Sequence, residues 1–205
     1  MALIYITYLI KNIISKMKTT KLKTNKFNFF DTVKVIHPEI FSDNRGYLYE
    51  SWNKRKFNVE LYGCDFCQEN HSFSKKNVLR GLHFQIKPYA QAKLVECIYG
   101  KIIDIVVDLR KESPTFLEWG AIELSDHNHI QIFIPEGFAH GFYTISETAH
   151  LIYKVNNYWH KQSERTIIWN DFNLSIDWKL ESKPILSKKD SLGKSINEIL
   201  VEDLF

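Results

Sequence analysis

From about residue 93 to residue 169 the sequence is a succession of short apolar runs separated by turn signals. The run Lys93 to Tyr99 is followed by the turn Gly100-Lys101, and then by a stretch to Leu109 in which apolar and polar residues alternate. Further runs cover 120–124, 130–134, 141–145, 151–155 and 166–169, with turns at 113–114, 126–128, 135–137 and 156–157. Alternation with period two predicts strands with one apolar and one polar-lined face. Many short strands at this spacing are typical of an all-β antiparallel sandwich or barrel.

The chain is long enough for one domain with a substantial core, since 44% of its 205 residues are hydrophobic. We assign residues 29–205 to this domain, with the β-structure ending near residue 178 and short capped helices near 187–190 and 195–200. Residues 53–61 are the one earlier stretch with helical periodicity. Residues 1–28 are interpreted as an extension, disordered or foreign to the native protein, with Met17 as an alternative start. Their apolar run at 2–10 is shorter than the roughly 20 residues that a membrane span needs.

Charge and cysteine content exclude several classes of protein. The 27 basic and 24 acidic residues nearly balance, which argues against a general nucleic-acid binder. The glycine-rich phosphate loops of Rossmann and P-loop proteins are missing. Three cysteines are an odd number for a secreted disulfide framework, and the pair Cys64 and Cys67 has neither a second ligand pair nor a following helix. We therefore expect a cytoplasmic protein that binds neither nucleic acid nor membrane.

Polar side chains within the strand-like runs indicate a ligand cavity. They are Arg80, His83, Gln85, Lys93, His140, Tyr153 and Lys154. Burying so many cationic and polar groups without partners would cost several kcal/mol. A polar cavity for an anionic ligand therefore explains them better than a packed core does.

Each of these residues also has an ordinary structural interpretation when it is taken alone. A single histidine such as His83 can be a satisfied structural residue, and Tyr153 can be a core aromatic with its hydroxyl bonded. Asp190 has the spacing of a capping box that begins at Ser187, and Arg45 can be an exposed turn residue. Only their joint pattern favours a catalytic site.

That joint pattern resembles the dTDP-4-dehydrorhamnose 3,5-epimerase family across roughly residues 30 to 192. The matching segments are D-N-R-G at 43–46 with Glu50, Q-E-N-H-S at 68–72, N-V-L-R-G-L-H-F-Q at 77–85, Q-A-K-L-V at 91–95, D-L-R-K-E-S-P-T-F at 108–116, I-P-E-G-F-A-H-G-F at 134–142, Y-K at 153–154 and S-K-K-D at 187–190. The resemblance implies a cupin-type jelly roll that forms a homodimer and acts on a dTDP-sugar.

The resemblance also implies residue roles. His83 matches the base that removes a proton beside a ketone, Asp190 the carboxylate paired with it, Tyr153 the acid on the opposite face, and Lys93 the cation that stabilises the enolate oxygen. The positions that match contacts to the nucleotide-sugar are Arg45, Glu50, Gln68, Glu69, Asn70, Arg80, His140, Glu164 and Lys189. Trp159 stands where the family often has a tyrosine that stacks on thymine, so the identity of the nucleotide is the part of the comparison most open to change.

The implied reaction inverts C3 and C5 of dTDP-4-dehydro-6-deoxy-D-glucose to give dTDP-4-dehydro-L-rhamnose. A 4-keto group acidifies the hydrogens on both carbons, so a base and an acid on opposite faces suffice, and no cofactor is expected. We also expect no metal, because the segment around His83 lacks the His-x-His pair of metal-binding cupins. The alternatives are a 3-epimerase or keto-isomerase acting on a related nucleotide-sugar, and a non-catalytic cupin that only binds one.

Overall fold

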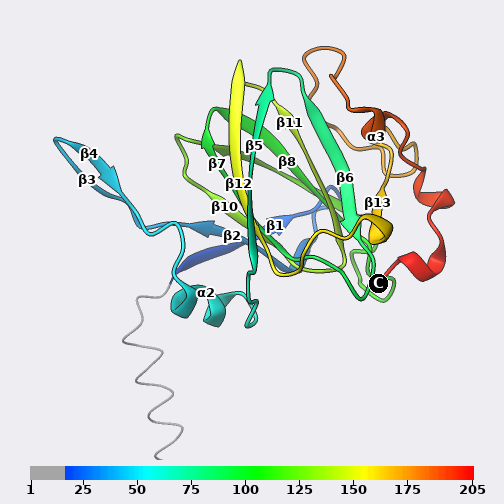
Figure 1. Cartoon of the computed structure of the whole chain (residues 1–205), viewed down its shortest axis with the longest axis horizontal. Helices are drawn as coiled ribbons and strands as arrows, with labels where there is room; N and C mark the ends of the chain where they lie inside the picture. Colours follow the sequence, from blue (N-terminus) through cyan, green and yellow to red (C-terminus); the bar gives the residue numbers. More distant parts are fainter. Residues whose placement is uncertain (1–16) are drawn as a thin grey trace, which may run out of the picture.

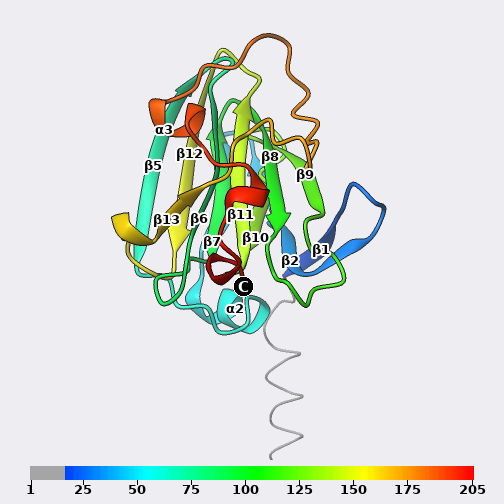
Figure 2. The same ribbon diagram turned by 90° about the vertical axis from the view of Figure 1, so that its right-hand side faces the viewer.

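A computed structural model describes residues 17–205 of the chain; the apolar run at 2–10 lies outside the described residues. The described chain forms two antiparallel sheets packed face to face, with the C-terminal segment running along the outside of one of them (Figures 1 and 2). In order across the sheet, the six-stranded sheet consists of β1 (Lys18–Lys23), β2 (Phe29–His37), β10 (Gln131–Ile134), β7 (Lys93–Tyr99), β12 (Thr148–Val155) and β5 (Gln68–Lys75). The five-stranded sheet consists of β13 (Glu164–Thr166), β6 (Leu79–Gln85), β11 (Phe138–Thr144), β8 (Lys101–Asp108) and β9 (Trp119–Ser125).

The remaining elements lie outside the two sheets. They are the hairpin of β3 (Phe41–Asp43) and β4 (Gly46–Leu48), the helices α2 (Lys54–Glu60) and α3 (Lys188–Ser191), and the 3-10 turns η1 (Lys161–Ser163), η2 (Ile196–Glu198) and η3 (Val201–Asp203). The hairpin projects away from the sandwich in Figure 1. Asn53 caps α2 by accepting a hydrogen bond from the Lys56 backbone N–H, and Ser187 caps α3 in the same way.

Three apolar clusters hold these layers together. The first lies between the sheets and includes Phe30, Val95 and Ile102. The second lies on the outer face of the five-stranded sheet, where the C-terminal segment covers it with side chains such as Trp178 and Ile196. The third packs α2 onto the outer face of the six-stranded sheet. Both faces of the five-stranded sheet are therefore buried.

Strand β8 shows how the alternating pattern is used. Its apolar residues Ile105 and Val107 belong to the outer cluster beneath the C-terminal segment, whereas Ile102 and Val106 face the other sheet. Asp104 and Asp108 share that inward face and are fully buried. The polar-lined face of this strand therefore faces the interior of the sandwich, where a buried carboxylate requires a partner.

The structure confirms the all-β, jelly-roll class and the short C-terminal helices, and it corrects the proposed N-terminal boundary. Residues 18–23, which were interpreted as part of an extension, form strand β1 and pair with β2. Leu22 is buried in the inter-sheet core, and the Thr24 hydroxyl donates to Glu118 at 2.6 Å. The described fold thus already includes residue 18. Within the described chain no helix is long and apolar enough to cross a membrane.

Two truncations would measure what β1 contributes. A chain that starts at Met17 keeps every described element, and we expect it to unfold like the full chain. A chain that starts at Lys26 loses β1 and the Thr24–Glu118 hydrogen bond, and its free energy of unfolding should fall by at least about 2 kcal/mol because Leu22 loses its burial. Urea denaturation of both proteins makes the comparison. Equal unfolding midpoints would show that β1 adds nothing to the fold.

Candidate active site

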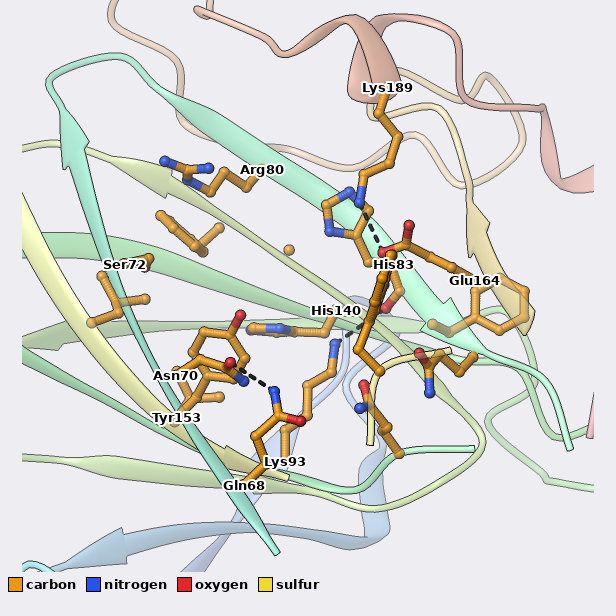
Figure 3. A pocket seen from close by; sticks show the side chains of 18 residues that line it. Gln68, Asn70, Ser72, Arg80, His83, Lys93, His140, Tyr153, Glu164 and Lys189 are labelled. Carbon is orange, nitrogen blue, oxygen red and sulfur yellow. Dashed lines mark hydrogen bonds and ion pairs between the residues drawn. The ribbon is translucent and has the colours of Figure 1, made fainter. Parts of the chain in front are cut away.

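A cavity of about 330 Å³ lies between the two sheets and is lined by side chains from both (Figure 3). Its volume is in the range of small-ligand sites in proteins. The predicted site residues that line it are Gln68, Asn70, Arg80, His83, Lys93, His140, Tyr153, Trp159, Glu164 and Lys189. The structure therefore brings together ten of the predicted site residues, which are spread over residues 68–189 of the chain.

Strand β5 supplies one wall by simple alternation. Gln68, Asn70 and Ser72 are two residues apart and all line the cavity. Glu69 has the opposite parity, so its carboxylate lies on the other face of the sheet, where it pairs with Lys154. Glu69 therefore does not line this cavity, and its predicted contact with the nucleotide-sugar stays a prediction. Lys154, which was expected at the cavity, likewise points away from it.

Strands β6 and β11 form the opposite wall and place two histidines side by side. His83 and His140 are direct partners in the register of these strands. Gly81 and Gly141 allow the close approach, because a Cβ on Gly81 would lie 2.5 Å from the Gly141 Cα, and Gly81 has a φ of +138°. Gly81 belongs to the motif at 77–85 and Gly141 to the motif at 134–142, which explains why these two motifs contain glycine within strands.

His83 is held by a carboxylate from the far end of the chain. Its Nε2 lies 2.5 Å from Oδ1 of Asp190, which is buried on α3. Oδ2 of the same carboxylate accepts from the Ser187 hydroxyl at 2.6 Å. Because a carboxylate only accepts, Nε2 carries the proton and Nδ1 is left with a free lone pair. The capping and the catalytic interpretations of Asp190 are thus compatible, since α3 fixes the carboxylate against the histidine.

The charges around this pair favour a neutral imidazole. Burial lowers the pKa of His83, and the nearby Lys189 and Lys93 lower it further, against the opposing effect of Asp190. Burial acts to raise the pKa of Asp190, but hydrogen bonds from His83 and Ser187 outweigh it and hold that pKa below its ordinary value. A neutral histidine beside an ionised aspartate can accept a proton at neutral pH.

Tyr153 faces the same cavity from the six-stranded sheet. It lies on β12, whereas His83 lies on β6 of the other sheet, and Figure 3 shows both side chains directed into the cavity. Burial raises the pKa of Tyr153, against the opposing charge of Arg80. The phenol therefore keeps its proton at neutral pH and can donate it. A proton acceptor and a proton donor are thus placed on opposite walls.

Lys93 is a buried cation between these walls. Its Nζ donates to the His83 carbonyl at 3.4 Å, and the side chain is almost fully buried. Burial lowers its pKa to about 8, with Asp104 and Glu164 opposing the shift. The lysine is therefore mostly protonated at neutral pH and can stabilise negative charge on a bound oxygen.

The rim of the cavity is formed by the segment after β12 and by α3. Gln85 accepts from the His160 backbone N–H at 2.7 Å and donates to the Tyr158 carbonyl at 3.2 Å, which fixes the segment that carries Trp159. Lys189 donates to Glu164 at 2.9 Å (Figure 3). An exposed indole and a lysine at one mouth suit a base and a phosphate.

Two predicted contact residues lie outside this cavity. Arg45 is on the projecting β3–β4 hairpin and pairs with Asp43 at 2.6 Å. Glu50 follows that hairpin and bonds to Asn53 and Lys56. Neither residue lines the cavity of its own chain, because the hairpin extends away from the sandwich (Figure 1). Their predicted contact with the nucleotide-sugar therefore stays a prediction.

Ser72 and Gln91 line the cavity and Asp104 lies near it, but none of the three was among the predicted site residues, whereas Gln85 was already expected at the cavity. Ser72 follows from the β5 alternation, and its buried hydroxyl has no partner within the described chain. Gln85 follows from its place two residues after His83. Asp104 gave a weaker signal, as a polar residue in an apolar strand, and it accepts from Nε2 of His140 at 2.7 Å.

Potential metal ligands do not converge in the described part of the chain. Over residues 17–205 no group of three or more histidine, cysteine, aspartate or glutamate side chains is arranged to hold an ion. At the cavity, His83 and His140 each have one nitrogen bonded to a carboxylate. The donor set is thus poor for a transition metal, which prefers three or more such ligands.

Known proteins resemble this chain over most of its length. The profile described as dTDP-4-dehydrorhamnose 3,5-epimerase matches residues 29–198. The dTDP-4-dehydrorhamnose 3,5-epimerase of Salmonella typhimurium is 48% identical over 173 residues, covering 83% of this chain and 94% of that protein. The crystal structure of the dTDP-6-deoxy-D-glucose-3,5-epimerase of Legionella pneumophila, in complex with dTDP-4-keto-L-rhamnose, superposes with a TM-score of 0.84 at 41% identity, covering 91% of this chain and 97% of that one.

A more distant structure has a narrower activity. A 3'-monoepimerase from Streptomyces bikiniensis, solved with dTDP-quinovose, gives a TM-score of 0.76 at 28% identity, covering 81% of this chain and 84% of that one. The fold is thus shared by enzymes of both kinds, whereas the curated relative with 48% identity is a double epimerase. On the extent of the profile match and the identity to these relatives, the chain belongs to the dTDP-4-dehydrorhamnose 3,5-epimerase family.

Proposed function

We propose that this chain inverts C3 and C5 of dTDP-4-dehydro-6-deoxy-D-glucose and so produces dTDP-4-dehydro-L-rhamnose for dTDP-rhamnose biosynthesis. The observation that carries the proposal is the placement of His83 and Tyr153 on opposite sheets around one cavity, with Lys93 between them. The identity to curated double epimerases supports the choice of substrate. The buried Lys93, the partly buried Arg80 and the exposed Trp159 at the rim fit an anionic nucleotide-sugar.

Each inversion proceeds through an enolate. Neutral His83 takes the proton from the carbon beside the ketone, and the electron pair of the broken C–H bond moves onto the carbonyl oxygen. Lys93 stabilises the negative charge on that oxygen. Tyr153 then delivers a proton to the opposite face of the carbon, the carbonyl re-forms, and both side chains exchange protons with water. Repetition at the second carbon completes the double inversion.

A coupled assay tests this function. The purified protein is incubated with dTDP-4-dehydro-6-deoxy-D-glucose, a dTDP-4-dehydrorhamnose reductase and NADPH. Consumption of NADPH that depends on the protein is expected, with dTDP-L-rhamnose as the product by NMR. A product inverted at C3 alone would identify a 3-epimerase, a ring ketone moved to another carbon would identify a keto-isomerase, and binding without turnover would identify a non-catalytic protein.

Turnover should not require a metal. The proposed mechanism handles the enolate charge with Lys93, and no cluster of three metal-ligating side chains occurs in residues 17–205. We therefore expect full activity after prolonged dialysis against EDTA. Loss of activity that a divalent ion restores would contradict this prediction.

We also propose that the protein is a homodimer in which the hairpin of each chain reaches the cavity of the other. The hairpin exposes Phe41, Tyr47 and Leu48, and so short a hairpin is marginal in water on its own. Arg45 and Glu50, which resemble substrate-contact positions, lie on and just after it, away from their own cavity. A second copy would cover the apolar side chains and bring both polar ones to a substrate.

Mixing two inactive variants tests the composite site. Light scattering should give the mass of a dimer. Arg45→Ala removes the hairpin contact, and His83→Ala removes the base. A mixed dimer then contains one site with an intact His83 and an intact hairpin from the partner, so random exchange should restore up to about a quarter of wild-type turnover. No recovery in mixtures that do exchange subunits would show that each chain completes its own site.

A cytoplasmic location is the remaining part of the proposal. Cys64, Cys67 and Cys97 are all free thiols, which is consistent with a reducing compartment. Cell fractionation followed by immunodetection would test the location, and enrichment outside the cytosolic fraction would contradict it.

A further inference from the structure

A second histidine–aspartate pair lies beside the first. His140 is the strand partner of His83, and its Nε2 lies 2.7 Å from Oδ2 of Asp104. Asp104 projects from β8 with no exposed surface, and it does not itself line the cavity. Each of the two neighbouring histidines is therefore backed by a different carboxylate.

The two carboxylates differ in how many of their oxygens have a hydrogen-bond partner. Both oxygens of Asp190 are bonded, one to His83 and the other to Ser187. Oδ1 of Asp104 has no hydrogen-bond partner among residues 17–205. A buried carboxylate with one bare oxygen is costly unless positive charge lies close by. Lys93 projects from the facing sheet into the neighbouring cavity and is almost fully buried, and the charge of Asp104 acts to raise the pKa of this lysine.

We propose that Asp104 is a positioning residue for the epimerase reaction: it fixes the ring and tautomer of His140 and, through its bare oxygen, supports the positive charge of Lys93 at the carbonyl oxygen of the substrate. This inference rests on the proposed role of Lys93 in stabilising the enolate. The two histidine–aspartate pairs then have different roles. Asp190 orients His83 as the base, whereas Asp104 orients His140 and supports the charge of Lys93, which stabilises the enolate oxygen.

The tautomer follows from the chemistry of the pair. An ionised carboxylate only accepts hydrogen bonds, so Nε2 of His140 must carry the proton. Nδ1 is then the nitrogen left for a ligand, because His140 lines the cavity and Nδ1 has no bond to the described residues. Without Asp104 the ring could rotate or change tautomer, and the contact with the ligand would change with it.

The effect of Asp104 on the protonation of Lys93 should be visible in the pH dependence of turnover, which a purely structural role of Asp104 would leave unchanged. The groups that act on this lysine are Asp104 from β8, Glu164 from β13 and Lys189 from α3, with His83 from β6 also coupled to it. The pKa of Lys93 is lowered to about 8, so wild-type turnover should fall as pH rises past about 8 and the lysine loses its proton. Removing the negative charge of Asp104 disfavours the charged form of Lys93. The alkaline limb of the pH–rate profile, in which turnover falls as pH rises, should then move to lower pH.

The test compares Asp104→Asn with Asp108→Asn. Asp108 lies on the same strand, has the same inward face and is also fully buried, but it bonds to Arg110 away from the cavity. For Asp104→Asn we expect a loss of about tenfold to a hundredfold in kcat, and the fall of activity at alkaline pH should move to lower pH by about one unit or more. For Asp108→Asn we expect the position of the limb to be unchanged, whatever happens to stability.

A second measurement needs no variant. The ¹⁵N ring shifts of His140 in the wild-type protein, with and without dTDP, should show Nε2 protonated in both. An Nδ1–H tautomer would overturn the proposal, as would an alkaline limb that stays in place in Asp104→Asn or moves equally in Asp108→Asn. If the coupled assay instead shows no epimerisation by the wild type, the proposed function fails, and the tautomer still reports on the Asp104 pair by itself.

Discussion

Replacing His83 with alanine is expected to lower turnover by about 10²–10⁴-fold, because the loss of a general base typically costs this much. Affinity for dTDP should stay close to that of the wild type, since the exposed Trp159 and Lys189 lie at the rim and are untouched by the change. Steady-state kinetics and calorimetric titration with dTDP measure the two quantities separately.

The exposed His127, in the turn before β10, provides a matched control. His127→Ala should retain wild-type turnover. Asp190→Asn should fall between the two, because the base remains but its orienting carboxylate has lost its charge. Turnover of His83→Ala within about threefold of wild type would eliminate His83 as the base.

Replacing Tyr153 with phenylalanine should separate proton exchange from inversion. The ring and its packing are kept, but the proton donor of the second wall is lost. His83 can still remove a proton, and the same proton or one from water can return to the same face. In D₂O the variant should therefore exchange hydrogen at the carbon that His83 reaches, while most net inversion is lost.

The exposed Tyr62, after α2, is the control for the loss of a phenol hydroxyl. Tyr62→Phe should exchange and invert like the wild type. If Tyr153→Phe inverted both carbons at the wild-type rate, another group would have to supply the second proton. If it lost exchange and inversion together, Tyr153 would be needed for the first proton transfer as well.

The parts of the fold that the sequence predicts are those with a local pattern. Strands β7 to β12 lie in apolar or alternating runs that are bounded by turn residues, and all of them appear in the structure. Strand β1 has no such pattern, because it is rich in lysine and threonine and buries one apolar residue, Leu22. Its place in the sheet depends on pairing with β2 and on the distant Glu118, which a local pattern does not contain.

The site residues, too, could be predicted where a local pattern marks them and not where distant pairing positions them. His83, Lys93 and Tyr153 stand out because charged or polar residues in apolar strands need an explanation, and the structure places all three at one cavity. Glu69 lies on the face of β5 opposite to the cavity, and this parity was readable from the sequence. Asp104 could be noticed but not assigned, because its partner is 36 residues away and is set by the pairing of β8 with β11.

The predicted contact between Arg45 and the substrate cannot be judged from the structure of a single chain. Its own chain positions Arg45 on a projecting hairpin, so the contact with substrate proposed for it requires a second copy of the chain. Neither the alternation of strands nor the cavity of one chain contains this information. The mixed-dimer experiment is for that reason more informative about Arg45 than a single substitution would be.

The measurement that tests double inversion most directly is the position of deuterium in the product formed in D₂O. Wild-type protein, the 4-keto sugar nucleotide, a coupled reductase and NADPH are combined in D₂O, and the rhamnose product is examined by NMR. Removal of a proton from one face and delivery of a solvent-derived proton to the other, at each centre in turn, predicts deuterium at both C3 and C5. Deuterium at C3 alone, or at neither carbon, would contradict the assignment of this chain as a 3,5-epimerase.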